Sequence, residues 1–201
     1  MNIMNIRSEN LELNPKVKIG VACFPTYGGS GMVAVEVGTA FAKRGHEVHF
    51  ISHGVPERLD TEIENVFFHL VDAPNYPLFS QQPISVALAA KIVDVCEHHK
   101  LDILHVHYAV PLATSAWLAA QVLGDKAPRI VTTLHGTDIT LVGSDPSYYS
   151  ITKFSIERSC ALTAPSKYLA DITKKTFSLS DEVNIEVIPN GVDVSRFSPY
   201  I

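Results

Sequence analysis

Cysteine is scarce in this chain and occurs in no metal-binding or redox pattern. The three cysteines, Cys23, Cys96 and Cys160, are far apart, and none belongs to a CxxC pair. An odd number of separated cysteines argues against a disulfide framework and against a thiolate metal site. We therefore expect reduced cysteines that pack as small apolar side chains.

Clusters of basic residues are also absent. The chain has 16 Lys and Arg residues and 21 Asp and Glu residues, which gives a net charge of -5. The basic residues form no stripe along the sequence that could follow the phosphates of a nucleic acid. Residues 1–16 are polar, carry charges of both signs and lack an apolar core, which is typical of neither a signal peptide nor a membrane anchor. We expect a cytoplasmic protein with no nucleic-acid partner and no membrane span.

Several catalytic motifs are missing. The sequence has no G-x-S-x-G elbow, no Walker A pattern and no HExxH, which argues against hydrolase, P-loop and zincin chemistry. It also has no D-x-D, the carboxylate pair that would hold a metal on a sugar nucleotide diphosphate. We expect no metal and no cofactor in the reaction.

Short apolar runs rich in β-branched residues alternate with segments of helical spacing. Strands are predicted at 17–24, 47–52, 66–71, 102–108, 129–136, 160–166 and 185–191. Helices are predicted after the glycines at 28–31, from near Pro83, and at 111–123, 146–159 and 166–177. This alternation predicts an α/β fold with a Rossmann-like, doubly wound parallel sheet. Ligands of such sheets bind beyond the carboxyl ends of the strands.

The segment GGSGMVA, at 28–34, joins the first predicted strand to the first predicted helix. Its glycines and Ala34 fit the G-x-G-x-x-A part of the dinucleotide-binding fingerprint. The acidic residue that should follow the second strand and bind a ribose is missing, because the strand ends in ISH at 51–53 and the next carboxylate is Glu57. The glycines and the free amides at the helix start instead suit a small anion such as a carboxylate or phosphate. A purely structural role in a tight turn and in helix packing remains open.

Histidines gather at two other predicted strand ends. Strand alternation in ILHVHY places His105 and His107 on one face and Tyr108 on the other. The three histidines His105, His107 and His135 suggest a zinc site. No carboxylate or cysteine is placed to complete the zinc ligands, and an H-x-H pair alone is a weak signal. His105 is either a buried, hydrogen-bonded residue or a ligand contact. His135, which is followed by glycine, is the stronger functional candidate, and Asp138 could instead cap the turn that follows it.

The motifs GGSG, HVHY, TTLHGTD and VIPNGVD, in this order and spacing, resemble the amino-terminal half of a GT-B retaining glycosyltransferase of family 4. The longer segments CFPTYGGSG, RGHEVHFIS, LDILHVHYAVP and VTTLHGTDITLVGSDPS resemble the family members that transfer N-acetylglucosamine from UDP-N-acetylglucosamine to L-malate, the first step of bacillithiol biosynthesis. The resemblance covers residues 17 to about 197.

The resemblance implies a role for each matching residue. Acceptor-binding residues would be Gly29, Ser30, Gly31, Tyr108 and Thr132; donor-side residues would be Gly28, His135 and Asn190, with His135 also the catalytic residue near the reacting carbon. The implied mechanism is a front-face displacement in which the leaving diphosphate helps to take the acceptor's proton. The protein then contributes mainly positioning and electrostatics.

The resemblance also implies a domain organisation. Residues 1–16 would be a polar leader, with disorder as an option, 17–193 the acceptor-side domain, and 194–201 the start of a linker to a carboxy-terminal nucleotide-sugar domain. That domain would be the main partner, the isolated half would be inactive, and a homodimer is an expectation from the family. Three alternatives stay open: another acceptor such as inositol phosphate or a sugar, with Lys91 or Arg58 near a phosphate; an NAD-binding oxidoreductase; and a non-catalytic anion- or sugar-binding module.

Overall fold

The computed structural model describes residues 15–26, 28–73, 78, 81–192 and 194. The strands are β1 (Lys18–Ala22), β2 (Glu47–Ser52), β3 (Val66–Leu70), β4 (Ile103–His107), β5 (Arg129–Thr133), β6 (Ala161–Ala164) and β7 (Ile185–Val187). The helices are α1 (Gly29–Lys43), α2 (Ile84–His99), α3 (Thr114–Leu123), α4 (Pro146–Glu157) and α5 (Lys167–Phe177), with short turns η1 (Ala109–Ala113), η2 (Gly124–Lys126) and η3 (Asp138–Val142).

All neighbouring strands run parallel in one seven-stranded sheet of order β3-β2-β1-β4-β5-β6-β7. The chain builds outward from β1 to β3 in one direction and from β4 to β7 in the other. The switch between β1 and β4 leaves a crevice beyond their carboxyl ends, which is where doubly wound sheets bind ligands. The predicted fold class is confirmed.

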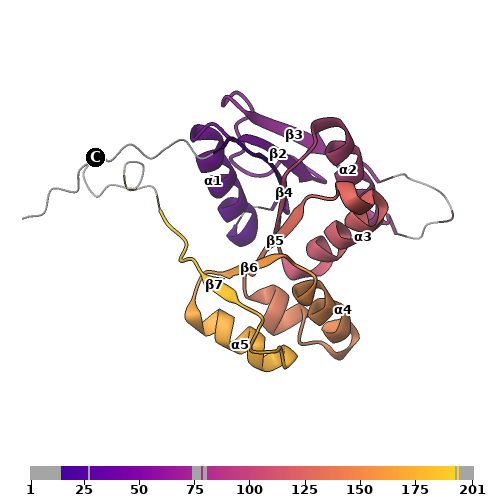
Figure 1. Ribbon diagram of the computed structural model, residues 1–201, viewed down its shortest axis with the longest axis vertical. Coiled ribbons are helices and arrows are strands. Elements are labelled where there is room, and N and C mark those ends of the chain that lie inside the picture. The colour runs from indigo at the N-terminus through magenta and orange to yellow at the C-terminus, as the bar shows by residue number, and fades with distance from the viewer. Residues whose placement is uncertain (1–14, 27, 74–77, 79–80, 193, 195–201) are drawn as a thin grey trace, which may run out of the picture.

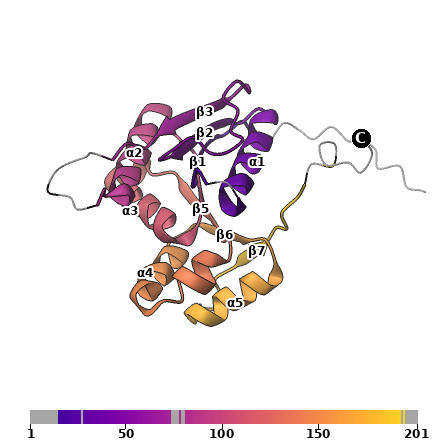
Figure 2. The same ribbon diagram turned by 180° about the vertical axis from the view of Figure 1, so that it is seen from behind.

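Helices cover both faces of the sheet. On one face α1 packs on Val21, Val48 and Phe50, and on the other α2 and α3 pack on Ile51 and Leu104. Figures 1 and 2 show α1 on one side of the sheet, α2 and α3 on the opposite side, and α4 and α5 near the β6–β7 edge. The alternation of apolar side chains along each strand therefore builds two cores, as a sheet covered on both faces requires.

Local sequence explains where the last two long helices begin. The Asp145 carboxylate accepts a hydrogen bond from the Ser147 N–H, and Pro146 occupies the first turn of α4. The Ser166 hydroxyl accepts from the Leu169 N–H at the start of α5. These caps satisfy amides that the first helical turn leaves without partners.

Each predicted strand and helix is present within a few residues of its expected bounds. The structure adds that β3 follows β2 through a loop without a helix, and that a separate π-helical turn, η1, precedes α3. The predicted leader, 1–16, falls outside the described residues except for its last two positions, and so does the predicted linker, 194–201, except for its first. Among the described residues, no helix is long and apolar enough to cross a membrane.

Candidate functional site

A cavity of about 440 Å³ lies beyond the carboxyl ends of the strands, next to the switch point. This volume falls in the usual range for small-molecule sites. Its lining combines the loop after β1, the start of α1 and the segments that follow β4, β5, β6 and β7. The lining residues are Thr26, Gly28, Gly29, Ser30, Val33, Tyr108, His135, Thr137, Pro165 and Asn190. The cavity thus brings together predicted residues from four separate motifs.

The glycine turn forms one wall of the cavity. Gly28 has a φ of 124° and Gly29 a φ of 35°, backbone conformations that side chains with a Cβ rarely adopt. Helix α1 begins at Gly29, the second residue of this turn, and no side chain caps its first amides. Ser30, in the first turn of α1, lines the cavity. This wall can donate hydrogen bonds to an anion.

Gly31 lies behind the wall and is buried. A Cβ at this position would lie 2.7 Å from the Phe24 carbonyl oxygen and 2.9 Å from that of Thr26. Backbone cannot yield as a flexible side chain can, so Gly31 allows α1 to pack closely on the loop after β1. The structural role left open for the glycines therefore applies at Gly31, while its predicted contact with the acceptor stays a prediction.

Tyr108 forms a second wall of the cavity. Its φ of 125° is rare for a residue other than glycine and turns the chain out of β4. The ring is stacked with His135 at 6.0 Å between centroids and meets Phe24 edge to face at 5.4 Å. The Tyr108 hydroxyl is in close hydrogen-bond contact with the Thr137 hydroxyl. Two hydroxyls from different strand ends therefore meet at the cavity.

A second histidine holds His135 in place. The His107 Nδ1 and His135 Nε2 atoms lie 3.1 Å apart in a hydrogen bond, which leaves His135 Nδ1 outside that bond. Burial, followed by the nearby His105, lowers the pKa of His135 to about 4. The imidazole is consequently neutral near pH 7, so it can act as a hydrogen-bond donor or acceptor but adds no fixed positive charge to the cavity.

Asp138 supports the loop that carries His135. It is fully buried, and its Oδ1 accepts from the N–H groups of His135 (3.0 Å) and Gly136 (2.8 Å) while its Oδ2 accepts from Ala109 N–H (3.1 Å). The carboxylate thus ties the turn after β5 to the turn after β4. The sequence also suggests Asp138 as a cap for the turn after it. Its carboxylate instead accepts hydrogen bonds from N–H groups of residues that come before it in the chain.

Thr132 does not line the cavity, so its predicted contact with the acceptor stays a prediction that this cavity does not support. Thr132 is fully buried, and its Oγ1 lies 2.8 Å from the hydroxyl oxygen of Ser159. Side chains alternate along β5, so Thr132 shares the face of Ile130, which α2 and α3 cover, while Thr133 points to the opposite face. There Thr133 Oγ1 lies 2.7 Å from Nε2 of the partly buried His105, which does not line the cavity.

No charged residue occurs among the described residues that line the cavity. Lys91, proposed as a phosphate contact, is on α2 and pairs with Asp94 at 3.0 Å. Arg58 lies in the loop between β2 and β3 and does not line the cavity either. The described walls offer amides, hydroxyls and imidazole, which favours a ligand that needs directional hydrogen bonds.

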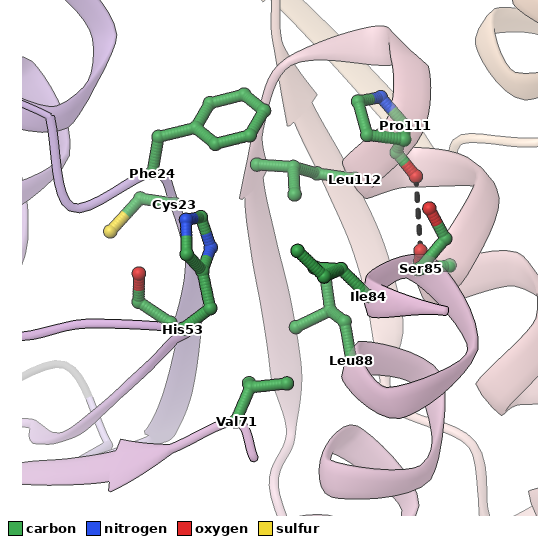
Figure 3. Close-up of a pocket in the computed structure, with 11 residues that line it drawn as sticks. Cys23, Phe24, His53, Val71, Ile84, Ser85, Leu88, Pro111 and Leu112 are labelled. Carbon is green, nitrogen blue, oxygen red and sulfur yellow. Dashed lines mark hydrogen bonds between the residues drawn. The ribbon is translucent and has the colours of Figure 1, made fainter. Parts of the chain in front are cut away.

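A second, smaller cavity lies beside the β1 end. Figure 3 shows Cys23, Phe24 and His53 facing Leu88 and Leu112 across it. Its volume is about 30 Å³, which has room for one or two water molecules and no substrate. The larger cavity is therefore the candidate substrate site.

Sequence reasoning missed four lining residues. Thr137 is inside the quoted LHGTD motif, and its position next to a predicted strand end could have suggested it. Thr26, in the quoted segment CFPTYGGSG, and Pro165, at the end of a predicted strand, carry the same kind of signal. Val33 carries none, because it lies on the first helix among apolar residues.

Comparisons with known proteins agree with this geometry. Residues 27–196 match Glycosyltransferase Family 4. The chain is 46% identical over 178 residues to the N-acetyl-alpha-D-glucosaminyl L-malate synthase of Bacillus anthracis; the match covers 89% of this chain and 46% of that protein. The chain therefore spans about half the length of the curated relative.

Two solved structures share the fold. A glycosyltransferase from Rickettsia africae has a TM-score of 0.67 and 21% identity, over 92% of this chain and 46% of the other. Anabaena Alr3699/HepE, in complex with UDP and glucose, has a TM-score of 0.64 and 15% identity, over 91% and 47%. With a family match over most of its length and the corresponding fold, the chain belongs to Glycosyltransferase Family 4.

Proposed function

We propose that this chain is the acceptor-binding, amino-terminal half of a retaining glycosyltransferase that transfers N-acetylglucosamine from UDP-N-acetylglucosamine to L-malate, the first step of bacillithiol biosynthesis. The observation that carries the proposal is the 440 Å³ cavity, in which Ser30, Tyr108, His135 and Asn190 converge from four motifs. The Bacillus anthracis relative, 46% identical, is an N-acetyl-alpha-D-glucosaminyl L-malate synthase, which supports N-acetylglucosamine as the transferred sugar and L-malate as the acceptor.

The start of α1 suits one carboxylate of malate. Gly28 and Gly29 let a ligand approach the backbone, and the uncapped amides together with the Ser30 hydroxyl supply donors. A helix N-terminus carries a partial positive charge, so these donors favour an anion even though no Lys or Arg is among the described lining residues.

The other wall orients the reacting groups. In this proposal the Tyr108 and Thr137 hydroxyls, which line the cavity, bind the acceptor, and His135, hydrogen-bonded to His107, contacts the donor sugar. A neutral His135 can bind a sugar hydroxyl and position the anomeric carbon without taking the acceptor's proton. In this proposal the leaving diphosphate takes the proton, and the chain contributes orientation and hydrogen bonding.

The diphosphate needs positive partners that the described lining does not supply. In the proposal a carboxy-terminal domain supplies them and closes the cleft, so catalysis requires both domains. A homodimer and a cytoplasmic location belong to the same proposal. Among the alternatives, inositol phosphate and NAD are less well suited to the described walls, because no basic residue lines them and β2 ends without an acidic residue.

The test is an amide NMR titration of the 201-residue chain with L-malate, inositol phosphate and NAD. We expect malate alone to shift the amides of Gly29, Ser30 and Tyr108, and Ser30→Ala to weaken this response. Ser144→Ala, an exposed serine outside the cavity, is the matched control. Shifts at the glycines with NAD and none with malate would overturn the acceptor assignment.

A UDP-release assay with both substrates tests whether catalysis requires both domains. We expect no turnover by the 201-residue chain, because the developing charge on the leaving group lacks a partner. Robust UDP release by this chain alone would contradict the two-domain requirement.

A further inference from the structure

Three histidines from separate elements meet on the face of the sheet covered by α2. They are His49 of β2, His69 of β3 and His99, the last residue of α2. One ring nitrogen of each lies within 4.8 Å of the others. The ring centroid of His49 is 4.2 Å from that of His99 and 5.1 Å from that of His69. Among the described residues, no other group of three or more His, Cys, Asp or Glu side chains converges in this way.

A carboxylate fixes how the central histidine presents its nitrogens. His49 is fully buried, and its Nε2 lies 2.9 Å from Glu47 Oε1. The carboxylate only accepts, so Nε2 carries the hydrogen, and in a neutral ring Nδ1 keeps its lone pair. That lone pair points toward His69, whose Nε2 lies 2.9 Å away. A carboxylate behind a histidine is the arrangement that orients imidazoles at metal sites.

The surroundings permit a cation and access to it. The two lysines whose charges act on His49 and His69 each pair with a carboxylate: Lys18 with Glu47, and Lys91 with Asp94, both at 3.0 Å. His69 and His99 are only partly buried, so their rings can adjust. Nitrogens around a tetrahedral Zn²⁺ lie about 3.3 Å apart, since each Zn–N bond is about 2.0 Å. The 2.9 Å pair is close to this spacing, and the third ring has to approach by about 1.5 Å.

The geometry points to a binding site for a divalent transition metal, best suited to Zn²⁺, formed by His49, His69 and His99 with water in the fourth position. Three imidazoles and an open position are a known zinc ligand set. The site is distinct from the substrate cavity, because it joins the β2–β3 edge to the carboxyl end of α2, whereas the cavity lies beyond the carboxyl ends of the strands. An ion here ties α2 to the sheet edge and takes no part in the transfer.

The test is a titration of the tag-free chain with Zn²⁺ in competition with a chromophoric chelator, together with Co²⁺ as a spectroscopic probe. We expect one Zn²⁺ per chain and, with Co²⁺, the visible absorption bands of four-coordinate nitrogen ligation. His69→Gln and His99→Gln should each weaken Zn²⁺ binding at least tenfold. Both residues are partly exposed, which avoids the folding risk of changing the buried His49.

His98→Gln is the matched control, because His98 is an exposed neighbour on the same helix end, bonded to Asp94. Its Zn²⁺ affinity should equal that of the unchanged chain. Zn²⁺ should also raise the Tm of the unchanged chain and of His98→Gln, but not of His99→Gln. Equal Zn²⁺ affinity in the unchanged, His69→Gln and His99→Gln chains, or no binding by the unchanged chain, would overturn the proposal.

Discussion

Replacing Asp138 with Asn removes a buried carboxylate while keeping the size of the side chain. Two of its three backbone partners, His135 and Gly136, bond to Oδ1, and Ala109 bonds to Oδ2. Asparagine can keep its carbonyl oxygen on the first pair, but its NH₂ group then faces the Ala109 N–H. Two donors meet, and a buried amide is left without an acceptor.

The magnitude follows from these contacts. An orphaned buried N–H costs about 1–3 kcal/mol, and the two remaining bonds each lose about 1 kcal/mol when a charged acceptor becomes neutral. Burial raises the pKa of Asp138 despite the backbone hydrogen bonds, so removing the charge recovers part of this loss. We expect Asp138→Asn to lower the free energy of unfolding by about 3 kcal/mol.

Urea denaturation followed by circular dichroism measures this loss. With an m-value of about 3 kcal/mol/M, the midpoint should fall by about 1 M. Asp145→Asn is the control: Asp145 caps α4 from an exposed position, and Asn caps a helix as well as Asp, so the midpoint should not move. A loss for Asp138→Asn no larger than that of the control would refute the reasoning.

Three further expectations can be checked in the same chain. Gly31→Ala, whose Cβ would meet two backbone carbonyl oxygens, should cost about 1–3 kcal/mol in urea unfolding, whereas Gly191→Ala, with no atom within 4 Å, should cost little; equal costs would contradict the close-packing role. Burial lowers the pKa of His105 and His135 from 6.5 to about 4, so the unfolded chain binds more protons than the folded chain between these pH values. The free energy of unfolding should therefore fall as the pH drops from 6.5 towards 4, by up to about 3 kcal/mol for each histidine. Urea midpoints at several pH values test this, and His105→Asn should make the midpoint depend less on pH. A thiol reagent should modify the exposed Cys160 quickly and the two buried cysteines, whose pKa burial raises to about 12, only on unfolding; three fast thiols in the folded chain would be the contrary result.

Much of the candidate site could be read from the sequence because its residues lie at predictable strand ends. Parallel strands end at one edge of the sheet, so the glycine turn, Tyr108 and His135 had to lie near one another once the alternation was recognised. Thr132 shows the limit of that reasoning. A position at a strand end predicts that a residue lies near the ligand-binding edge of the sheet. Which face of the sheet its side chain occupies changes with a shift of a single residue, and here Thr132 points to the face where it meets Ser159.

The sequence by itself determined the class of fold, the order of its elements and the family. Apolar periodicity and ordered motifs are local features of the chain, so they can be recognised without knowing which residues are in contact. Only the tertiary structure decided which side chains share a space. The tie from Asp138 to Ala109, the support of His135 by His107 and the meeting of His49, His69 and His99 each join residues from separate elements. No local pattern encodes such contacts, since they arise from strand pairing and from the way the helices return across the sheet.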